Sequence, residues 1–139
     1  MTRVPSPEDE SALIEAFFVR EKQERVIRKL RGPLRKRDAE LREHLPHESR
    51  WNPAFVVPIP PAAQTVEAVG RELLRRGAAM EAAVYILSAD RNLDTRVCSL
   101  RDALRDVVGT STGSVISCVR GKLAYYEGEE PGNRFILAR

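Results

Sequence analysis

Residues Ser114–Glu127 read SVISCVRGKLAYYE, and this stretch decides the fold. Two runs rich in β-branched and aromatic residues, Ser114–Val119 and Leu123–Glu127, are separated by Arg120-Gly121-Lys122. Two such runs joined by a short glycine-containing turn predict an antiparallel β-hairpin. Arg134–Ala138 follows the turn-rich segment GEEPGN and is predicted to add a strand. The C-terminal end of the chain is therefore expected to form a small antiparallel sheet.

Upstream of the hairpin, the segment Glu81–Ser88 contains the unbroken apolar run AAVYIL. Such a run predicts a central strand that is buried on both faces. Leu100–Val108 is predicted to be a short helix, because Ser99 and Asp102 have the spacing of a capping box at its start. The prolines around Ala54–Val57 allow only a short edge strand there, since proline has no backbone N–H to donate.

The N-terminal half shows helical periodicity. The first helix is predicted from about Pro7 to Leu30, opened by Ser6 or Ser11 with acidic residues in its first turn. A second helix is predicted from Pro33 to about Leu45, and the two form a helical hairpin. A third helix is predicted from about Pro61 to Arg76.

The apolar residues of the first helix do not share one face. At 100° per residue they form two nearly opposite groups: Leu13, Ile14, Phe17 and Phe18, and then Val26, Ile27, Leu30 and Leu34. A helix that lies on a single core keeps one apolar face. The pattern therefore predicts either a bend near residues 20–25 or two halves that pack against different partners, which include another subunit.

These elements predict an α+β fold in which an N-terminal helical hairpin and further helices pack on a small, mainly antiparallel sheet formed by the C-terminal half. The length of 139 residues suits a single domain, residues 1–139. Within it we expect a helical hairpin at 1–45, a proline-rich extended connector at 46–61, and a body of helix and sheet at 62–139.

The charge of the chain is concentrated in one segment. The whole sequence carries a net charge of +3, but residues 1–19 are acidic and residues 43–139 hold equal numbers of both signs. Residues 20–42 contain ten Lys or Arg against four interleaved acids. Such a segment is either a solvated helix face or an electrostatic footprint for an anionic partner.

Nothing in the sequence predicts a membrane partner or export. Its longest apolar runs are far shorter than the roughly 20 residues that a membrane-spanning helix needs. The N-terminus, MTRVPSPEDE, is acidic and broken by proline, unlike a signal peptide. Two widely spaced cysteines, Cys98 and Cys118, do not make a disulfide scaffold. We therefore expect a cytoplasmic protein with reduced thiols.

Two motifs resemble metal sites and fail on inspection. Asp90, Asn92 and Asp94 match the first three ligands of a calcium loop, but Thr95 and Arg101 stand where the loop needs glycine and glutamate. His44 and His47 are interrupted by Pro46 and have no cysteine nearby to complete a zinc set. We expect no metal and no cofactor.

No group of residues forms a catalytic constellation along the sequence. A dispersed site near residues 90–98 remains a hypothesis, with Asp90, Asp94, Arg96 and Cys98 as candidates. It requires the fold to bring these side chains together with His44, His47 or Glu127. Alternation along the hairpin sends Tyr125 and Tyr126 to opposite faces of the sheet, so we expect one of them at the surface.

The leading hypothesis is a non-catalytic protein-binding or regulatory domain that self-associates, as a homodimer for example, or binds a protein partner through its N-terminal helices. The candidate contact residues are Leu13, Phe17, Phe18, Val26, Ile27, Leu30 and Tyr126. The alternative is nucleic-acid binding through the basic hairpin, residues 20–42, which has no aromatic residue for stacking. The candidate contact residues are then Arg28, Lys29, Arg31, Arg35 and Arg37.

Overall fold

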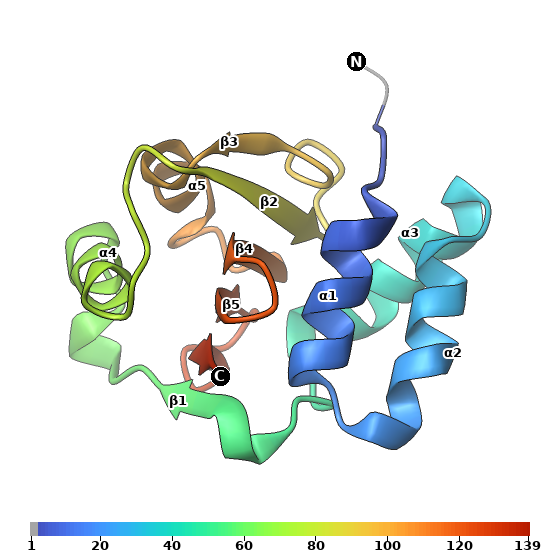
Figure 1. Ribbon diagram of the computed structural model, residues 1–139, viewed down its shortest axis with the longest axis horizontal. Helices are drawn as coiled ribbons and strands as arrows, with labels where there is room; N and C mark the ends of the chain where they lie inside the picture. The colour runs from blue at the N-terminus through green and yellow to red at the C-terminus, as the bar shows by residue number, and fades with distance from the viewer. Residues whose placement is uncertain (1–2) are drawn as a thin grey trace.

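The computed structural model describes residues 3–139, whose backbone forms three layers (Figure 1). The strands are β1 (Val56–Pro58), β2 (Ala83–Ser88), β3 (Val97–Ser99), β4 (Ser114–Val119), β5 (Leu123–Glu127) and β6 (Arg134–Ala138). The α-helices are α1 (Pro7–Phe17), α2 (Arg20–Leu30), α3 (Leu34–His44), α4 (Val66–Arg75) and α5 (Leu100–Val107). Short 3₁₀ turns, η1 (Leu45–His47), η2 (Pro53–Phe55) and η3 (Pro61–Ala63), complete the fold.

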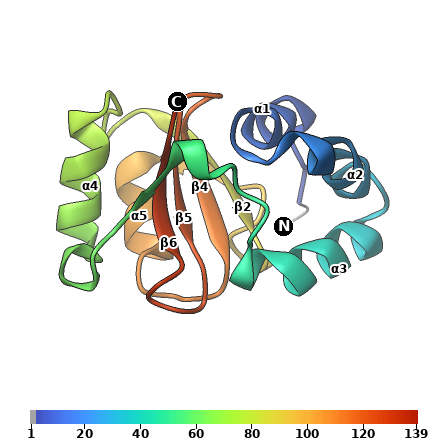
Figure 2. The ribbon, with the colours of Figure 1, turned by 90° about the horizontal axis from the view of Figure 1, so that it is seen from below.

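The sheet is the middle layer. Its strands are all antiparallel to their neighbours, in the order β1-β6-β5-β4-β2-β3. Figure 2 shows α1, α2 and α3 on one face of the sheet, with α4 and α5 on the other. The expected α+β fold, with helices packed on an antiparallel sheet, is confirmed.

The hairpin that decides the fold forms at the predicted residues. β4 and β5 pair on either side of Arg120-Gly121-Lys122, and Gly121 takes a φ of 72°, a conformation that glycine adopts without strain. β6 pairs with β5, and the short edge strand β1 pairs with β6. β2 is buried from Val84 onward, as predicted, but lies second from the edge because the three-residue strand β3 covers its outer side.

The predicted first helix is two helices, because the chain breaks at Phe18 and Val19. Phe18 is extended and forms a bridge with Trp51. The Val19 N–H donates to the carbonyl of Arg50 at 2.8 Å, and the Asn52 N–H donates to the carbonyl of Phe17 at 2.7 Å. The backbone groups freed at the break are thus satisfied by the connector, and the predicted bend lies just before residues 20–25.

This break turns the two opposed apolar groups toward the same core, apart from Leu34, which is exposed. Five of the residues proposed as partner contacts are at most 3% exposed: Leu13, Phe17, Phe18, Val26 and Leu30. They pack with Leu41, Leu45 and the sheet in one cluster, and Ile27 packs against it. The opposed groups therefore give little support to a self-association surface, because one chain already buries all of their residues except the half-buried Ile27 and the exposed Leu34.

The expectation that one hairpin tyrosine reaches the surface is wrong. Tyr125 and Tyr126 do point to opposite faces, but both are fully buried. Tyr126 belongs to the core beneath α1–α3, and Tyr125 belongs to the core beneath α4 and α5. A sheet covered by helices on both faces has no solvent side. Tyr126 is therefore unavailable to a partner.

Candidate functional site

The exposed cations of residues 20–42 form a basic surface, which we call the basic face. It comprises Arg20, Lys22, Arg25, Arg28, Lys29, Arg31, Arg35, Lys36 and Arg42, all exposed except the half-exposed Lys29. On α2, Val26 and Leu30 are buried in the core, and the cations of this helix lie outside that buried stripe. Burial of the apolar stripe therefore turns the basic residues outward.

Few ion pairs hold these cations. Arg28 pairs with Glu24 at 2.9 Å, with both side chains more than 70% exposed, so the contact contributes little and exchanges readily with solvent. Arg31 donates to the hydroxyl of Ser11 at 2.7 Å. Across residues 3–139, no ion pair involves the remaining arginines of the basic face or Lys22 and Lys36.

Arg37, one of the predicted nucleic-acid contacts, is fully buried. Its Nη1 and Nη2 donate to the two carboxylate oxygens of Glu10 at 2.6 and 2.7 Å. Its Nε and Nη2 donate to Asp94 at 3.1 and 3.0 Å. A side chain enclosed in this way cannot touch a phosphate, so Arg37 is removed from the predicted binding set.

Arg37 keeps its charge in this buried network. Burial alone would lower the pKa of Arg37, but the hydrogen bonds to Glu10 and Asp94 outweigh it and raise the pKa above its usual value. The Tyr85 hydroxyl also donates to Glu10. Burial, and then the negative charge of Glu10, raise the pKa of Tyr85, so this hydroxyl stays protonated. The network ties α1 and α3 to β2 and to the loop that follows it.

Two of the four acids in residues 20–42 face inward. Arg3 donates to both oxygens of Asp38 at 2.6 and 2.8 Å, and this hydrogen bonding lowers the pKa of Asp38. Glu40 accepts from Arg50 at 2.9 Å, and only 3% of its side chain is exposed. Glu21 and Glu24 are the exposed acids that remain. The surface of this segment is therefore more basic than its composition suggests.

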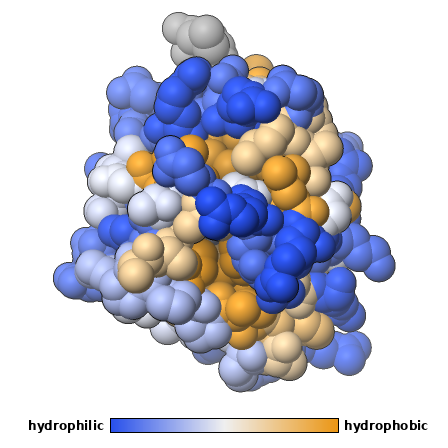
Figure 3. Space-filling view, turned by 90° about the vertical axis from the view of Figure 1, so that its left-hand side faces the viewer, coloured by the Kyte–Doolittle hydropathy of each residue, from blue (hydrophilic) through white to orange (hydrophobic). Residues whose placement is uncertain are grey.

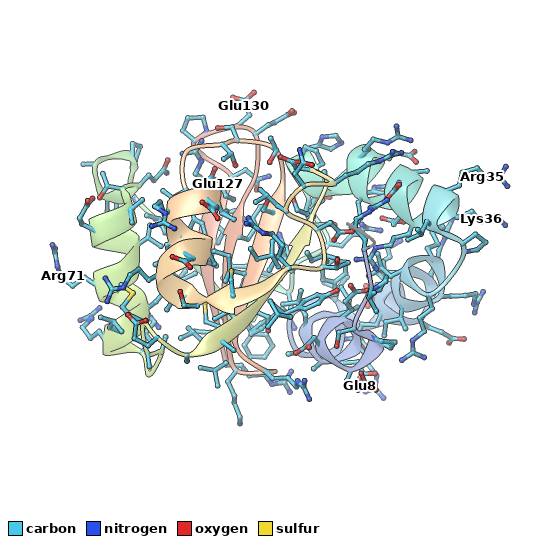
Figure 4. The ribbon with its side chains drawn as sticks, turned by 90° about the horizontal axis from the view of Figure 1, so that it is seen from above. Glu8, Arg35, Lys36, Arg71, Glu127 and Glu130 are labelled. Carbon is cyan, nitrogen blue, oxygen red and sulfur yellow. The ribbon has the colours of Figure 1, made fainter. Side chains whose placement is uncertain are left out.

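Two hollows flank the turn between α2 and α3. One, of about 540 Å³, lies between the helices and is bordered by Arg28, Lys29 and Lys36, as well as by Glu40 and Glu43. The other, of about 450 Å³, lies between the turn and the N-terminal segment. It is bordered by both charged and apolar residues, among them Arg3, Arg31 and Leu34. Figure 4 shows Arg35 and Lys36 projecting from the end of the molecule, away from the sheet.

The fold keeps the residues of the hypothetical dispersed site in separate roles. Asp94 anchors Arg37 and accepts from the Ser88 N–H at 3.1 Å. Asp90 accepts from the Asn92 N–H within its own loop, and Arg96 pairs with Asp106 at 3.0 Å. Cys98 lies on the edge strand β3. None of these residues borders either hollow beside the turn.

The other proposed participants also have contacts of their own. Glu127 is fully buried and accepts from the Gly109 N–H and the Ser111 N–H at about 3 Å, which holds the loop before β4. His44 lies 3.9 Å from Glu40, and His47 lies 3.7 Å from Glu129. Within residues 3–139, no three His, Cys, Asp or Glu side chains are placed to hold a metal ion together.

Residues 3–139 contain no helix with the length and apolar character needed to cross a membrane. No protein-family model, no curated protein and no solved structure matches the chain. Function must therefore be inferred from the geometry of the molecule itself.

Proposed function

We propose that this chain is a non-catalytic binding domain that holds the phosphate backbone of double-stranded nucleic acid on the basic face. The observation that carries the proposal is the sorting of charge in residues 20–42. Nine cations lie at the surface, whereas Asp38 and Glu40 are turned into the protein. An arrangement of this kind concentrates positive potential on one side of a small domain and attracts a polyanion.

The composition of the basic face favours backbone contact over the reading of bases. Six of its nine cations are arginines, whose planar guanidinium groups donate two hydrogen bonds to one phosphate. No aromatic residue occurs between Arg20 and Leu45, so the face lacks the stacking platforms on which single strands bind. A duplex presents its phosphates outward at regular spacing and needs no such platform. We therefore expect binding that is independent of base sequence.

A protein partner at the N-terminal helices is the competing proposal, and its support has weakened. Most of the apolar residues that suggested it are inside the chain, and Leu34 is the exposed exception. The other exposed side chains of this segment are mainly charged, and an acidic protein surface would use the same cations as a phosphate backbone. A competition experiment separates the two proposals. If only other nucleic acids displace a bound duplex, the present proposal is supported. If an acidic protein binds more tightly than the duplex, the present proposal is contradicted.

The test is fluorescence anisotropy of a labelled 20-base-pair duplex at low salt. The basic-face variant carries Arg28→Gln, Arg31→Gln, Arg35→Gln and Lys36→Gln. Its matched control removes four exposed arginines from the opposite helical layer: Arg71→Gln, Arg75→Gln, Arg101→Gln and Arg105→Gln. The two variants have the same net charge and lose it on opposite helical layers of the molecule.

We expect the basic-face variant to lose at least about tenfold in affinity relative to the matched control, since each arginine–phosphate contact is charge-assisted. Equal losses in the two variants would mean that only net charge matters, and the proposal would then fail. Absence of binding by the unmodified protein at low salt would also overturn it. Circular dichroism of each variant shows whether the fold is intact.

A further inference from the structure

A second cavity lies on the opposite side of the sheet from the basic face, where α4 stands away from β1. Its volume is about 450 Å³, within the range of small-molecule sites. We call it the α4 groove. Val57, Ile59 and Ile136 form its sheet side, and Ala68 and Val69 form its helix side. It therefore opens between two layers of the fold, at the sheet edge formed by β1.

The groove is apolar inside and charged along one rim. Pro58, Pro60 and Ala63 complete its apolar border. The charged residues that line it all come from α4: Arg71, Glu72, Arg75 and Arg76. Figure 3, which views the molecule from the side of α4, shows apolar residues in orange beside strongly hydrophilic residues in blue.

The rim has an excess of positive charge. Arg75 and Arg76 both contact Glu72, at 2.8 Å, and hydrogen bonds from Arg75 and then Arg76 lower the pKa of that carboxyl. One acid is thus shared between two arginines. Arg71 makes no ion pair or side-chain hydrogen bond within residues 3–139, and Figure 4 shows it at the end of the molecule opposite Arg35 and Lys36.

We propose that the α4 groove binds a small amphipathic carboxylate, with an acyl chain between α4 and the sheet and its carboxylate on Arg71 and Arg75. Charge complementarity selects the anionic end, because the rim cations outnumber the single acid. The one-sided rim selects a ligand with one charged end, since Val57, Ile59 and Ile136 offer only apolar contact. This site is separate from the basic face and does not depend on nucleic-acid binding.

The test is an NMR titration of the ¹⁵N-labelled protein with octanoate, with octylammonium as the probe of opposite charge. We expect octanoate to shift amide signals of residues 57–59 and 66–76 in a saturable way, and octylammonium to bind about tenfold more weakly. The proposal would be overturned if octanoate shifted no amide signals, or shifted signals only at scattered surface positions. Equal binding of octanoate and octylammonium would also overturn it.

Three variants locate the ligand. Arg71→Gln with Arg75→Gln removes the rim charge and is expected to weaken octanoate binding about tenfold. Ala68→Trp fills the groove and is expected to abolish it. Arg101→Gln with Arg105→Gln, which removes exposed arginines from α5, is the control and should bind as the unmodified protein does. Undiminished binding by the rim variant contradicts the assignment, as does tighter binding of an acidic, apolar peptide than of octanoate.

Discussion

Arg35 and Arg37 are two residues apart on α3, yet one is exposed and the other is fully buried. The sequence contains the signal that separates them. Arg37 lies one helical turn before the buried Leu41, and so occupies the inward stripe of α3. Glu10 lies likewise on the apolar stripe of α1, three residues before Leu13. Opposite charges on two inward stripes predict a buried ion pair. A count of charges along the chain, in contrast, does not distinguish Arg37 from Arg35.

Arg37→Met tests the importance of this network to stability. It leaves Glu10 and Asp94 without their cation in a buried site, and we expect the free energy of unfolding to fall by about 3–5 kcal/mol. Urea unfolding followed by the fluorescence of Trp51 measures it. Arg35→Met, an exposed change of the same chemistry, should stay within about 0.5 kcal/mol of the unmodified protein. Similar stabilities for the two variants would show that the buried pair contributes little.

Asp38 makes the free energy of unfolding depend on pH, and the direction of that dependence follows from its contact with Arg3. The hydrogen bonds from Arg3 lower its pKa in the folded state, so folding favours the carboxylate. The stabilisation is complete above the unfolded pKa of about 3.9 and is lost as the pH falls through the lower folded value. Asp38→Asn should therefore destabilise the protein at pH 7, with a difference that shrinks below pH 4.

Urea unfolding at several pH values between 7 and 3 measures that difference. Glu24→Gln, which alters a carboxylate that is 88% exposed, is the control and should change stability little at any pH. A destabilisation by Asp38→Asn that is equal at pH 7 and pH 3 would mean that the Arg3 contact does not act through charge.

At the scale of elements, Ser6 and Ser99 each cap the start of a helix, as local signals predict, by accepting a backbone N–H three residues on. The third helix is predicted from about Pro61, but α4 begins at Val66, capped by Thr65, because Pro61–Ala63 forms a separate 3₁₀ turn. The break at Phe18 has no comparable local signal, because no proline or glycine stands there. It is set by pairing with residues 50–52, more than 30 positions away. Periodicity predicts either a bend or two halves that pack against different partners, and long-range pairing decides where the first helix ends.

Gly113 is the point where the loop before β4 meets the turn η1. Its φ is +94°, and an added Cβ would lie 2.6 Å from the backbone nitrogen of Pro46. Gly109 has nearly the same φ, +93°, with nothing within 4 Å of an added Cβ. Gly109→Ala should cost about 1–2 kcal/mol for the left-handed backbone. We expect Gly113→Ala to cost clearly more, since its backbone neighbours must also move.

Thermal and urea unfolding of these two variants separate the two effects. The excess cost of Gly113→Ala over Gly109→Ala measures the contact between the β4 loop and η1. If the two variants are equally stable, that contact is loose in solution.

At the scale of the whole molecule, the three-layer arrangement explains which predictions succeed. The hairpin, the capped helix α5 and the α+β class follow from local patterns. The burial of both Tyr125 and Tyr126 does not, because it requires helices on each face of the sheet. The α4 groove also escaped sequence reasoning, since residues from β1, α4 and β6 come together only in the folded chain. Its one local sign is the run of charged residues at 71, 72, 75 and 76.

The same arrangement predicts the oligomeric state of the protein in solution. The large apolar residues that remain exposed, Val4, Leu34, Leu74, Val97 and Val119, come from several elements across the fold. Because these residues come from different elements, we expect a monomer. Light scattering coupled to size exclusion should give 15.6 kDa across the micromolar range. A concentration-independent dimer would restore the self-association hypothesis and show that another surface supports it.

The salt dependence of duplex binding tests the central claim, that the basic face carries the function, most directly. Each phosphate that the protein neutralises releases counterions, so the logarithm of the affinity falls linearly with the logarithm of salt, by about 0.9 per contact. We expect this slope to be the same for the unmodified protein and for the matched control, in which four arginines of α4 and α5 are replaced. The basic-face variant should have a slope shallower by about two to four. Identical slopes for all three proteins would contradict the assignment of binding to α2 and α3.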